Sequence, residues 1–458
     1  MEQVGFRNRK VNTVRSGSIK TFQYILMVFF QILSLSACSA DSTDSFFNKT
    51  PQKTLSNNGS HEVNTPVVIK FFSNVPDRTQ GLGNLEQKLL DEYLKDHPEL
   101  NIKTEFLHDE IYRQKILVYM TSNDLPDIFF TWSLPSFFDP LVKGSYLAEL
   151  NLEDYTQYDF QDGALDSFTR DGKLYGLPKN LDFWVLYYHA DIFEKMKIKV
   201  PENYLQLLET VRLLKAKGIT PCAINGQDKW SLAINLQVFI EESANETNHP
   251  DEIYYRAACY YKKLMDAGFY QPDFDTTDYS SARNLFLQGR TAMYTMGSWE
   301  MGMATDVSIP EKVRNNIRAA VFLGPGSGVE AANNLVGWYG GGYSVYSNSS
   351  VKTEAIKLIN TIMLPGNYAK LGWNNGYVIP PVNLVNYLNG KESALQKDLI
   401  DILERAGSIS GPAFNDRLTP GFKSEAENLV LQLSKGVLIP EMFVEELKKA
   451  KEKAESDE

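Results

Sequence analysis

The stretch Val67-Val68-Ile69-Lys70-Phe71-Phe72 is the first part of the chain whose pattern indicates a folded core. All its side chains except Lys70 are apolar, and its first three are β-branched. A nearly continuous apolar run of this length is typical of a strand that is buried on both faces of a sheet. We therefore expect the globular part of the protein to begin here.

Segments of helical and strand character alternate after this run. An apolar stripe through Leu85, Leu89 and Tyr93 predicts a helix that ends before Pro98. The further predicted elements are a strand at 102–106, a helix at 112–120, strands at 125–130 and 183–188, a helix at 201–218, strands at 291–296 and 343–346, and helices at 355–363 and from about 441 onward. A hairpin or tight connection is expected around Asp171-Gly172. Short links between alternating strands and helices predict a mostly parallel sheet flanked by helices, so the expected fold class is α/β.

The N-terminus carries a basic stretch, then the apolar run 22–35, then Leu35-Ser36-Ala37-Cys38. This order looks like a bacterial lipobox, in which the cysteine becomes the lipid-bearing first residue after cleavage. We expect residues 1–37 to be a signal peptide and 38–63 to be a flexible tether from the lipidated Cys38. The alternative is an uncleaved anchor helix followed by an incidental buried thiol. In either case the body of the protein would lie outside the cytoplasmic membrane.

The charge of the chain narrows the range of its partners. The formal net charge is −11, and removal of 1–37, which holds five basic side chains and one acidic side chain, would make it −15. An acidic surface argues against nucleic acid or anionic lipid as a direct partner. Membrane attachment would then come from acyl chains on Cys38. Cys222 and Cys259 are the other cysteines, and they could form a pair or stay as free thiols.

Motifs of catalysis and cofactor binding are missing from the sequence. It contains no GxxxxGK[ST], no HExxH and no GxSxG, and its five histidines are scattered. We therefore expect no cofactor and no metal site.

Aromatic residues are plentiful, with 6 Trp, 24 Tyr and 25 Phe. Trp132 and Trp299 follow predicted strands, and open α/β sheets bind ligands outside the carboxyl ends of their strands. A flat indole there would offer an apolar platform for the C–H face of a sugar ring. Trp184 lies inside a predicted strand, so we expect it to pack in the core.

Five segments, in order, resemble the family 1 extracellular solute-binding proteins of ATP-binding-cassette importers, the group that contains the maltose-binding protein. They are 123–129, 171–178, 186–193, 289–299 and 341–345. The resemblance extends from about Val67 to the C-terminus. It implies a periplasmic-binding-protein-like type II fold, in which two α/β lobes are joined by a hinge and hold a ligand in the cleft between them. Lobe one would comprise 64–178 and 320–366, and lobe two would comprise 179–319 and 367–458.

The resemblance also implies ligand-binding residues. Trp299, in Gly297-Ser298-Trp299, matches the sugar-stacking tryptophan of the family, and Asp182 matches an acidic cleft residue. The acidic–basic pair often found beyond Trp132 is replaced by Leu134-Pro135-Ser136, which makes a maltose-like ligand less expected. Asp77 and Glu300 could equally be surface carboxylates. The full set of candidates is Asn74, Asp77, Trp132, Ser133, Asp182, Trp230, Trp299, Glu300, Gly341, Gly342 and Trp373.

The resemblance predicts a monomeric, lipid-anchored receptor on the extracellular face of a bacterial membrane. It would capture a carbohydrate, chiefly an oligosaccharide, and deliver it unaltered to the permease subunits of the importer. One alternative is a binding protein for a non-sugar solute, because the same fold serves varied ligands. Another is an extracellular glycoside-cleaving enzyme, which needs two carboxylates about 5–10 Å apart. Only Asp182 can be placed in the cleft as such a group.

Overall fold

The computed structural model describes residues 66–325 and 334–456. The signal peptide, Cys38 and the tether predicted at 38–63 lie outside this part of the chain. Among the described residues, no helix has both the length and the apolar character needed to cross a membrane.

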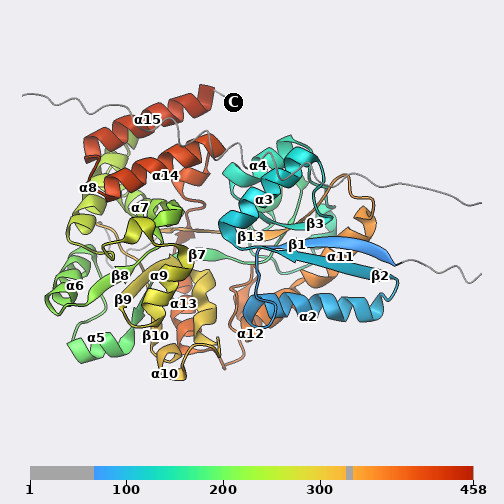
Figure 1. The fold of residues 1–458 in the computed structure, drawn as a ribbon, viewed down its shortest axis with the longest axis horizontal. Coiled ribbons are helices and arrows are strands. Elements are labelled where there is room, and N and C mark those ends of the chain that lie inside the picture. The colour runs from blue at the N-terminus through green and yellow to red at the C-terminus, as the bar shows by residue number, and fades with distance from the viewer. Residues whose placement is uncertain (1–65, 326–333, 457–458) are drawn as a thin grey trace, which may run out of the picture. The chain divides into compact units, whose positions relative to one another are not determined.

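The first sheet is built around the strand predicted from the apolar run at 67–72. Its order is β2-β1-β3-β13-β6, and β1 pairs in parallel with both β2 and β3. The strands are β1 (Val67–Ser73), β2 (Leu100–Phe106), β3 (Ile128–Trp132), β13 (Gly341–Val345) and β6 (Leu177–Pro178). The helices around it are α2 (Gly81–Asp96), α3 (Asp109–Ser122), α4 (Pro135–Lys143) and α11 (Lys352–Ile362). In Figure 1, α2 and α11 lie on one side of this sheet and α3 and α4 on the other.

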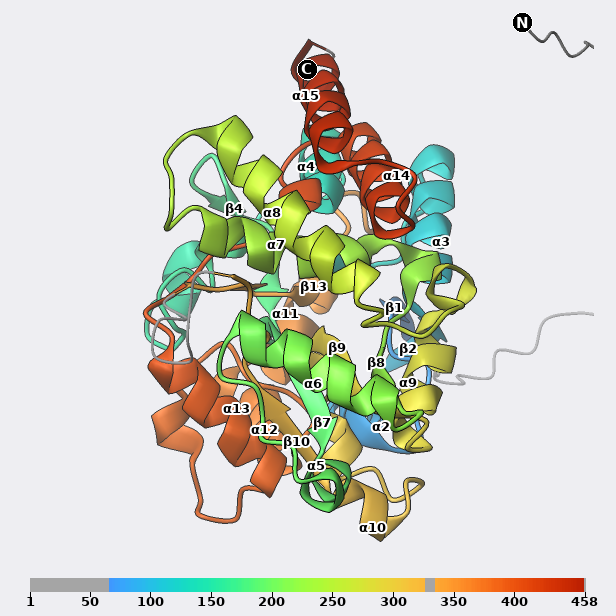
Figure 2. The same cartoon turned by 90° about the vertical axis from the view of Figure 1, so that its left-hand side faces the viewer.

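The second sheet has the order β10-β7-β9-β8, and β12 also pairs with β7. Its strands are β7 (Asp182–His189), β8 (Thr220–Ala223), β9 (Thr291–Gly297), β10 (Ile317–Ala320) and β12 (Gly337–Trp338). Figure 2 shows α6 in front of this sheet, with α7, α8, α14 and α15 above it. The helices of this half are α5 (Ala190–Met196), α6 (Tyr204–Ala216), α7 (Trp230–Ser243), α8 (Pro250–Asp266), α9 (Tyr279–Leu287), α10 (Glu311–Arg314), α13 (Ala394–Arg405), α14 (Pro420–Ser434) and α15 (Pro440–Ser456).

The expectation of mostly parallel pairing is wrong for much of both sheets. β13 is antiparallel to β3 and β6, and β7 is antiparallel to β9 and β10. A parallel pair needs a crossover connection, whereas β13 enters the first sheet directly from β12 of the second. The pattern of apolar residues therefore locates these strands without fixing their direction.

Local sequence accounts for several element boundaries. The β3 strand begins at Ile128, three residues later than expected, because Pro126 cannot donate a ladder hydrogen bond. The predicted hairpin is confirmed, since β4 (Thr169–Arg170) pairs antiparallel with β5 (Lys173–Leu174). Asp171 adopts a φ of 50° in its turn, which aspartate tolerates better than most residues.

Two separate hydrophobic cores lie under the two sheets. The first contains Phe71, Phe129 and Tyr343, and the second contains Trp184, Tyr187 and Tyr294. The cores therefore divide the described chain into two α/β lobes, the fold class that the resemblance implied. Core membership differs from the expected lobe ranges at two places. Phe322 and Leu335 pack in the second core, and Tyr368 and Val378 pack in the first.

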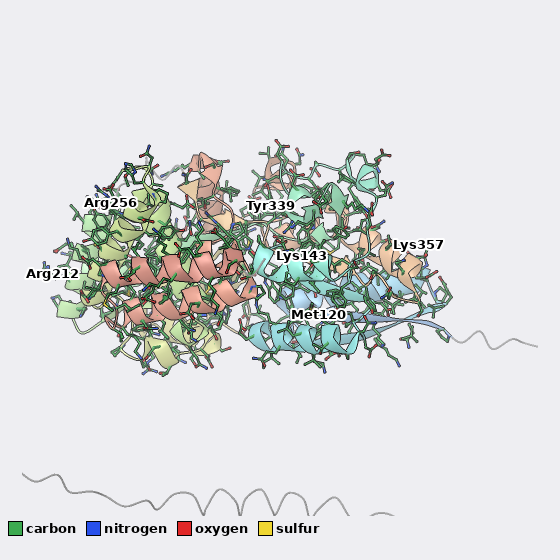
Figure 3. The ribbon with its side chains drawn as sticks, turned by 90° about the horizontal axis from the view of Figure 1, so that it is seen from above. Met120, Lys143, Arg212, Arg256, Tyr339 and Lys357 are labelled. Carbon is green, nitrogen blue, oxygen red and sulfur yellow. The ribbon has the colours of Figure 1, made fainter. Side chains whose placement is uncertain are left out.

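Tyr339, on one of the segments between the lobes, makes contacts with the first lobe. Its hydroxyl donates to the backbone oxygen of Asp162 at 2.9 Å, and its own carbonyl accepts from the Ser133 hydroxyl at 2.6 Å. Figure 3 shows Tyr339 at the junction between the two halves.

Candidate functional site

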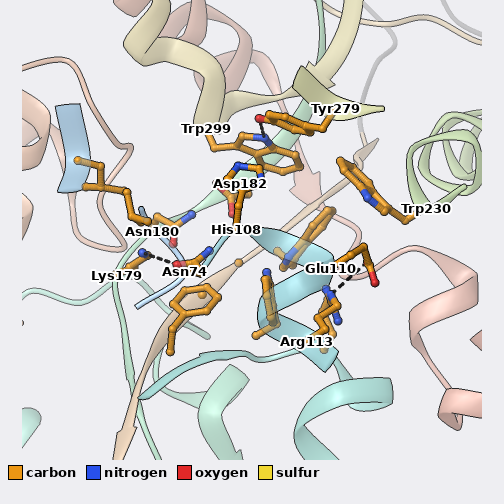
Figure 4. Close-up of a pocket in the computed structure, with 18 of the residues that line it drawn as sticks. Asn74, His108, Glu110, Arg113, Lys179, Asn180, Asp182, Trp230, Tyr279 and Trp299 are labelled. Atoms are coloured by element: carbon orange, nitrogen blue, oxygen red, sulfur yellow. Dashed lines mark hydrogen bonds and ion pairs between the residues drawn. The ribbon is translucent and has the colours of Figure 1, made fainter. Parts of the chain in front are cut away.

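Segments that cross between the lobes are hydrogen-bonded to one another. Lys179 N donates to Gly341 O at 2.8 Å, Gly340 N donates to Asn180 O at 3.1 Å, and Leu181 N donates to Ile379 O at 2.8 Å. A pocket of about 430 Å³ lies against these segments and is lined from both lobes. Figure 4 shows residues that line this pocket. Its volume suits a small organic ligand.

The wall on lobe two is aromatic. Trp230, Trp299, Trp338 and Tyr279 all line the pocket. The Trp299 ring centre lies 6.1 Å from that of Trp230 and 6.3 Å from that of Trp338, with tilted rings. These spacings are typical of favourable aromatic pairs, so the wall is a packed aromatic surface.

A chain of hydrogen bonds holds the Trp299 indole in place. Its Nε1 donates to the Tyr279 hydroxyl at 3.1 Å, and that hydroxyl donates to the Glu300 carboxylate. Arg283 Nε also donates to Glu300, at 2.9 Å. The indole folds back over Gly297, where a Cβ would lie only 2.0 Å from a ring carbon. Glycine is therefore required at this strand end for the ring to take its position.

The wall on lobe one carries Trp132 at the end of β3. The Arg113 guanidinium, from α3, lies 3.9 Å from the centre of the Trp132 ring. Phe130 and Phe137 meet the same indole edge to face, at 4.7 and 5.1 Å between ring centres. This wall is thus an indole fixed by aromatic edges with a cation over one face.

Asp182 lies where β7 begins, on the floor of the pocket. Burial raises the pKa of its carboxyl to about 7, although a hydrogen bond from Asn180 and the charge of Lys179 act in the opposite direction. A Cβ at Gly340 would lie 1.7 Å from Asp182 Oδ2, so only glycine leaves room for this carboxyl. Asp182 is therefore placed to accept a hydrogen bond from a ligand.

A buried ionic cluster supports the lobe-one side of the floor. Glu86 is 2% exposed and accepts hydrogen bonds from Arg78 at 2.7 Å, Ser73 at 2.8 Å and Tyr343 at 2.8 Å. Lys179 Nζ lies 3.4 Å from Glu86 Oε1. Burial opposes the ionised carboxyl, but Lys179 and then Arg78 outweigh it, so the pKa of Glu86 is lowered.

The same lysine connects this cluster to the pocket. Lys179 Nζ donates to Asn74 Oδ1 at 3.4 Å, and Lys179 and Asn74 both line the pocket. The Glu86 cluster therefore fixes two polar groups that a ligand would meet.

The rim of the pocket joins the two lobes through a second ionic cluster. Ser136, on α4, donates to Asp416 Oδ1 at 2.5 Å, and Lys423 Nζ lies 3.0 Å from the same oxygen. Lys423 also pairs with Glu427 at 2.5 Å. Burial acts to raise the pKa of the Asp416 carboxyl, but the positive charges of Lys423 and then Arg113 outweigh it. The pKa of Asp416 is therefore lowered.

The structure brings together most of the candidates named from the sequence. The predicted residues that line the pocket are Asn74, Asp77, Trp132, Asp182, Trp230, Trp299 and Gly341. Figure 4 shows Asn74, Asp182, Trp230 and Trp299 around this space. Asp77 is held by Thr79, whose hydroxyl and backbone N–H both donate to it.

Four candidates do not line the pocket. Trp373 is 0% exposed and packs in the second core, so it offers no surface to a ligand. Glu300 is buried and accepts a hydrogen bond from the Tyr279 hydroxyl, so it holds Tyr279 in place and does not face the pocket. Ser133 donates to the backbone of Tyr339, and Gly342 is buried within β13.

Other lining residues were not predicted. Asn180 and Trp338 could have been found, because Asn180 is two residues before Asp182 and Trp338 is three residues before Gly341. No sequence pattern indicated a binding role for three other lining residues, Arg113, Asp416 and Lys423. They lie on or beside helices, far from the predicted strand ends.

The described residues hold no group of three or more His, Cys, Asp or Glu side chains placed for a metal ion. Both Cys222 and Cys259 are free thiols.

A sequence profile of the bacterial extracellular solute-binding proteins matches residues 77–369, which is more than half of the chain. The chain belongs to this family. The resemblance inferred from the five segments is therefore confirmed, and so is the expectation of a binding protein and not an enzyme.

Two relatives of this solute-binding protein share about a quarter of the aligned residues with it. An uncharacterized ABC transporter extracellular-binding protein of Pyrococcus horikoshii is 27% identical over 54% of this chain and 63% of its own length. The multiple sugar-binding protein of Streptococcus mutans is 22% identical over 51% of this chain and 58% of its own. The chain thus spans less than two thirds of either relative.

Among solved structures, a chitin oligosaccharide binding protein has a TM-score of 0.73 to this solute-binding protein at 23% identity. The alignment covers 85% of this chain and 99% of that one. This likeness shows that the two share a fold.

The raised pKa of Asp182 predicts a pH-dependent stability for the ligand-free solute-binding protein. The folded state binds a proton that the unfolded chain releases near pH 4, so stability falls as pH rises from about 4 to about 7 and then levels off. Asp182→Asn removes this titration. We expect the gain in stability of the variant over the wild type to grow across that window, as measured by denaturant unfolding at pH 4.5, 5.5, 6.5 and 7.5. A constant difference would show that the carboxyl is ionised throughout.

Proposed function

We propose that this solute-binding protein captures a carbohydrate, chiefly an oligosaccharide, between its lobes and hands it unaltered to the permease of an ABC importer. The observation that carries the proposal is the pairing of a packed indole wall with a buried carboxyl on the floor of one pocket. Relatives whose names refer to sugars support it, among them the multiple sugar-binding protein of Streptococcus mutans.

The chemistry of the pocket suits a sugar ring. Such a ring has apolar C–H faces, which pack against indole, and a rim of hydroxyls that both donate and accept hydrogen bonds. Trp299 would lie beneath a ring face, while Asp182 accepts from a hydroxyl and Lys179 or Asn180 donates to another. A wrong stereoisomer would leave buried polar groups unpaired, which costs about 1–3 kcal/mol for each group.

Closure of the two lobes would couple capture to delivery. A ligand that touches both walls stabilises the closed arrangement over the open one, because its contacts are complete only there. A permease that recognises both lobes together would then take up the loaded form selectively.

Titration calorimetry with a panel of maltotriose, raffinose, xylotriose and chitotriose tests the proposal. We expect saturable binding of at least one of these sugars, with the sugar recovered unchanged. Absence of heat with every member, combined with binding of a peptide or polyamine, would refute it.

We also propose that the protein is anchored to the outer face of the membrane through acyl chains on Cys38. In the producing bacterium, Cys38→Ser should abolish palmitate labelling and move the protein from the membrane fraction to the medium. Cys259→Ser is the matched control, because Cys259 lies in α8 of the folded body and should leave both readouts unchanged. Membrane retention of the Cys38 variant without any label would contradict lipid anchoring.

A further inference from the structure

We infer that Arg113 is the ligand-binding group of the lobe-one wall, and that it donates two N–H groups to neighbouring hydroxyl oxygens of an uncharged sugar. This inference rests on the proposed function and adds a specificity-determining residue to the same pocket. On the face of the Trp132 ring that Arg113 covers, the ligand would meet the guanidinium and not the indole.

The position of Arg113 sets the geometry. Its guanidinium lies 3.9 Å over the Trp132 ring and 5.4 Å from the Phe137 ring centre. The cation therefore occupies one indole face, and a sugar ring cannot stack on that face while Arg113 is there. The contact with the two rings restrains the Arg113 side chain, so less side-chain entropy is lost when its N–H groups bind.

Within the described part of the chain, no hydrogen bond uses the N–H groups of Arg113. A guanidinium carries five N–H donors, but among the described residues the nearest acidic partner is Glu110, with its Oε1 3.7 Å from Arg113 Nε. That separation makes an ion pair and is too long for a hydrogen bond. The Arg113 side chain is 21% exposed and lines the pocket, so its donors can reach a ligand.

Arg170 provides the contrast within the same lobe. It also lies over an aromatic ring, 5.1 Å from the centre of Phe138. Its donors are engaged, however, by Asp139 at 2.7 Å and by three backbone carbonyls. Arg170 thus keeps its donors paired although it lies over a ring, whereas Arg113 lines the pocket without a hydrogen bond to another described residue.

The surrounding charges favour an uncharged ligand. The other two pocket cations are occupied, Lys179 by Glu86 and Lys423 by Asp416. The carboxyl groups that line the pocket are those of Asp77, Glu110, Asp182 and Asp416. A sugar acid would place its carboxylate among these groups, and among the described pocket residues Arg113, which already forms an ion pair with Glu110, is the one cation without a hydrogen bond to a carboxylate. Hydroxyl oxygens accept from Arg113 without such repulsion.

The test compares three variants by calorimetry. Arg113→Met keeps an unbranched apolar side chain over Trp132 but removes every N–H donor. Arg113→Lys keeps the positive charge but loses the planar arrangement of N–H groups that can bind two oxygens at once. Arg212→Met is the matched control, because Arg212 is exposed on α6 and pairs with Glu209. The probes are the tightest-binding sugar of the neutral panel and glucuronic-acid-substituted xylotriose.

We expect Arg113→Met to weaken binding of the neutral sugar about tenfold or more, and Arg113→Lys to recover little of this loss. Arg212→Met should bind like the wild type, and the unfolding midpoint of ligand-free Arg113→Met should stay near that of the wild type.

Binding by Arg113→Met within twofold of the wild type would overturn the inference and leave the proposed function intact. Tighter binding of the acidic sugar than of the neutral one would overturn the assignment to an uncharged ligand. Failure of the wild type to bind any sugar would instead refute the proposed function.

Discussion

Glu86→Ala should destabilise the protein by about 3–5 kcal/mol, because it leaves two buried cations without their carboxylate. The Arg78 and Lys179 side chains are 10% and 4% exposed, and both are paired with Glu86. The hydroxyls of Ser73 and Tyr343 also lose an acceptor. Chemical denaturation of the ligand-free protein at neutral pH measures the loss directly.

Glu92→Ala is the matched control for this experiment. Glu92 lies on the same helix, is exposed, and makes no ion pair with another described residue. We expect its replacement to change the free energy of unfolding by less than about 0.5 kcal/mol. A Glu86 variant as stable as this control would show that water reaches Arg78 and Lys179 when the carboxylate is removed.

The pH dependence of this cluster should be opposite to that of Asp182. The pKa of Glu86 is lowered in the folded protein, so its stabilisation is present above the unfolded value near 4.5 and is lost as pH falls through the folded value. Asp182 is destabilising above its unfolded value, and this cost is complete only above about pH 7. Glu86 therefore supports the folded state at neutral pH, while Asp182 lowers its stability in exchange for a hydrogen-bond acceptor in the pocket.

The fold could be predicted from sequence to the extent that it depends on local pattern. The apolar runs at 67–72 and 183–188 located β1 and β7, and the apolar stripe through Leu85 and Leu89 located α2. The direction of β13 could not be predicted in the same way. The residues of a strand indicate that it is buried, but its pairing direction depends on the connection that precedes it. The chain reaches β13 from the second sheet, and β13 pairs antiparallel with β3.

The pocket was predictable where function is tied to strand ends. Trp299 follows β9, as its place after a predicted strand implied, and it lines the pocket. Asp182, the first residue of β7, also lines the pocket, but only the resemblance to the family pointed to it. Trp373 shows the limit of the argument, because an indole is equally suited to a core, and this one is buried in the second core. Arg113 shows the opposite limit. A single arginine on a helix has many possible roles, and only its stacking on Trp132 distinguishes it.

Trp299→Ala should weaken sugar binding by about 1–3 kcal/mol, which corresponds to roughly five- to 150-fold in Kd. The indole is anchored by Tyr279 and lies beside Trp230 and Trp338, so its removal takes away the best-fixed part of the aromatic wall. Calorimetry with the tightest-binding sugar of the panel measures the loss.

Two further variants separate the ring from its surroundings. Trp299→Phe keeps an aromatic face but loses the Nε1 donor to Tyr279, so we expect an intermediate loss of affinity. Trp373→Phe removes part of a fully buried indole outside the pocket, so it should lower stability and leave Kd nearly unchanged. If Trp299→Ala and Trp373→Phe shift Kd equally, the effect of Trp299 comes from general destabilisation and the indole does not contact the sugar. A selective loss at Trp299 would place the ligand against lobe two, opposite the donors of Arg113.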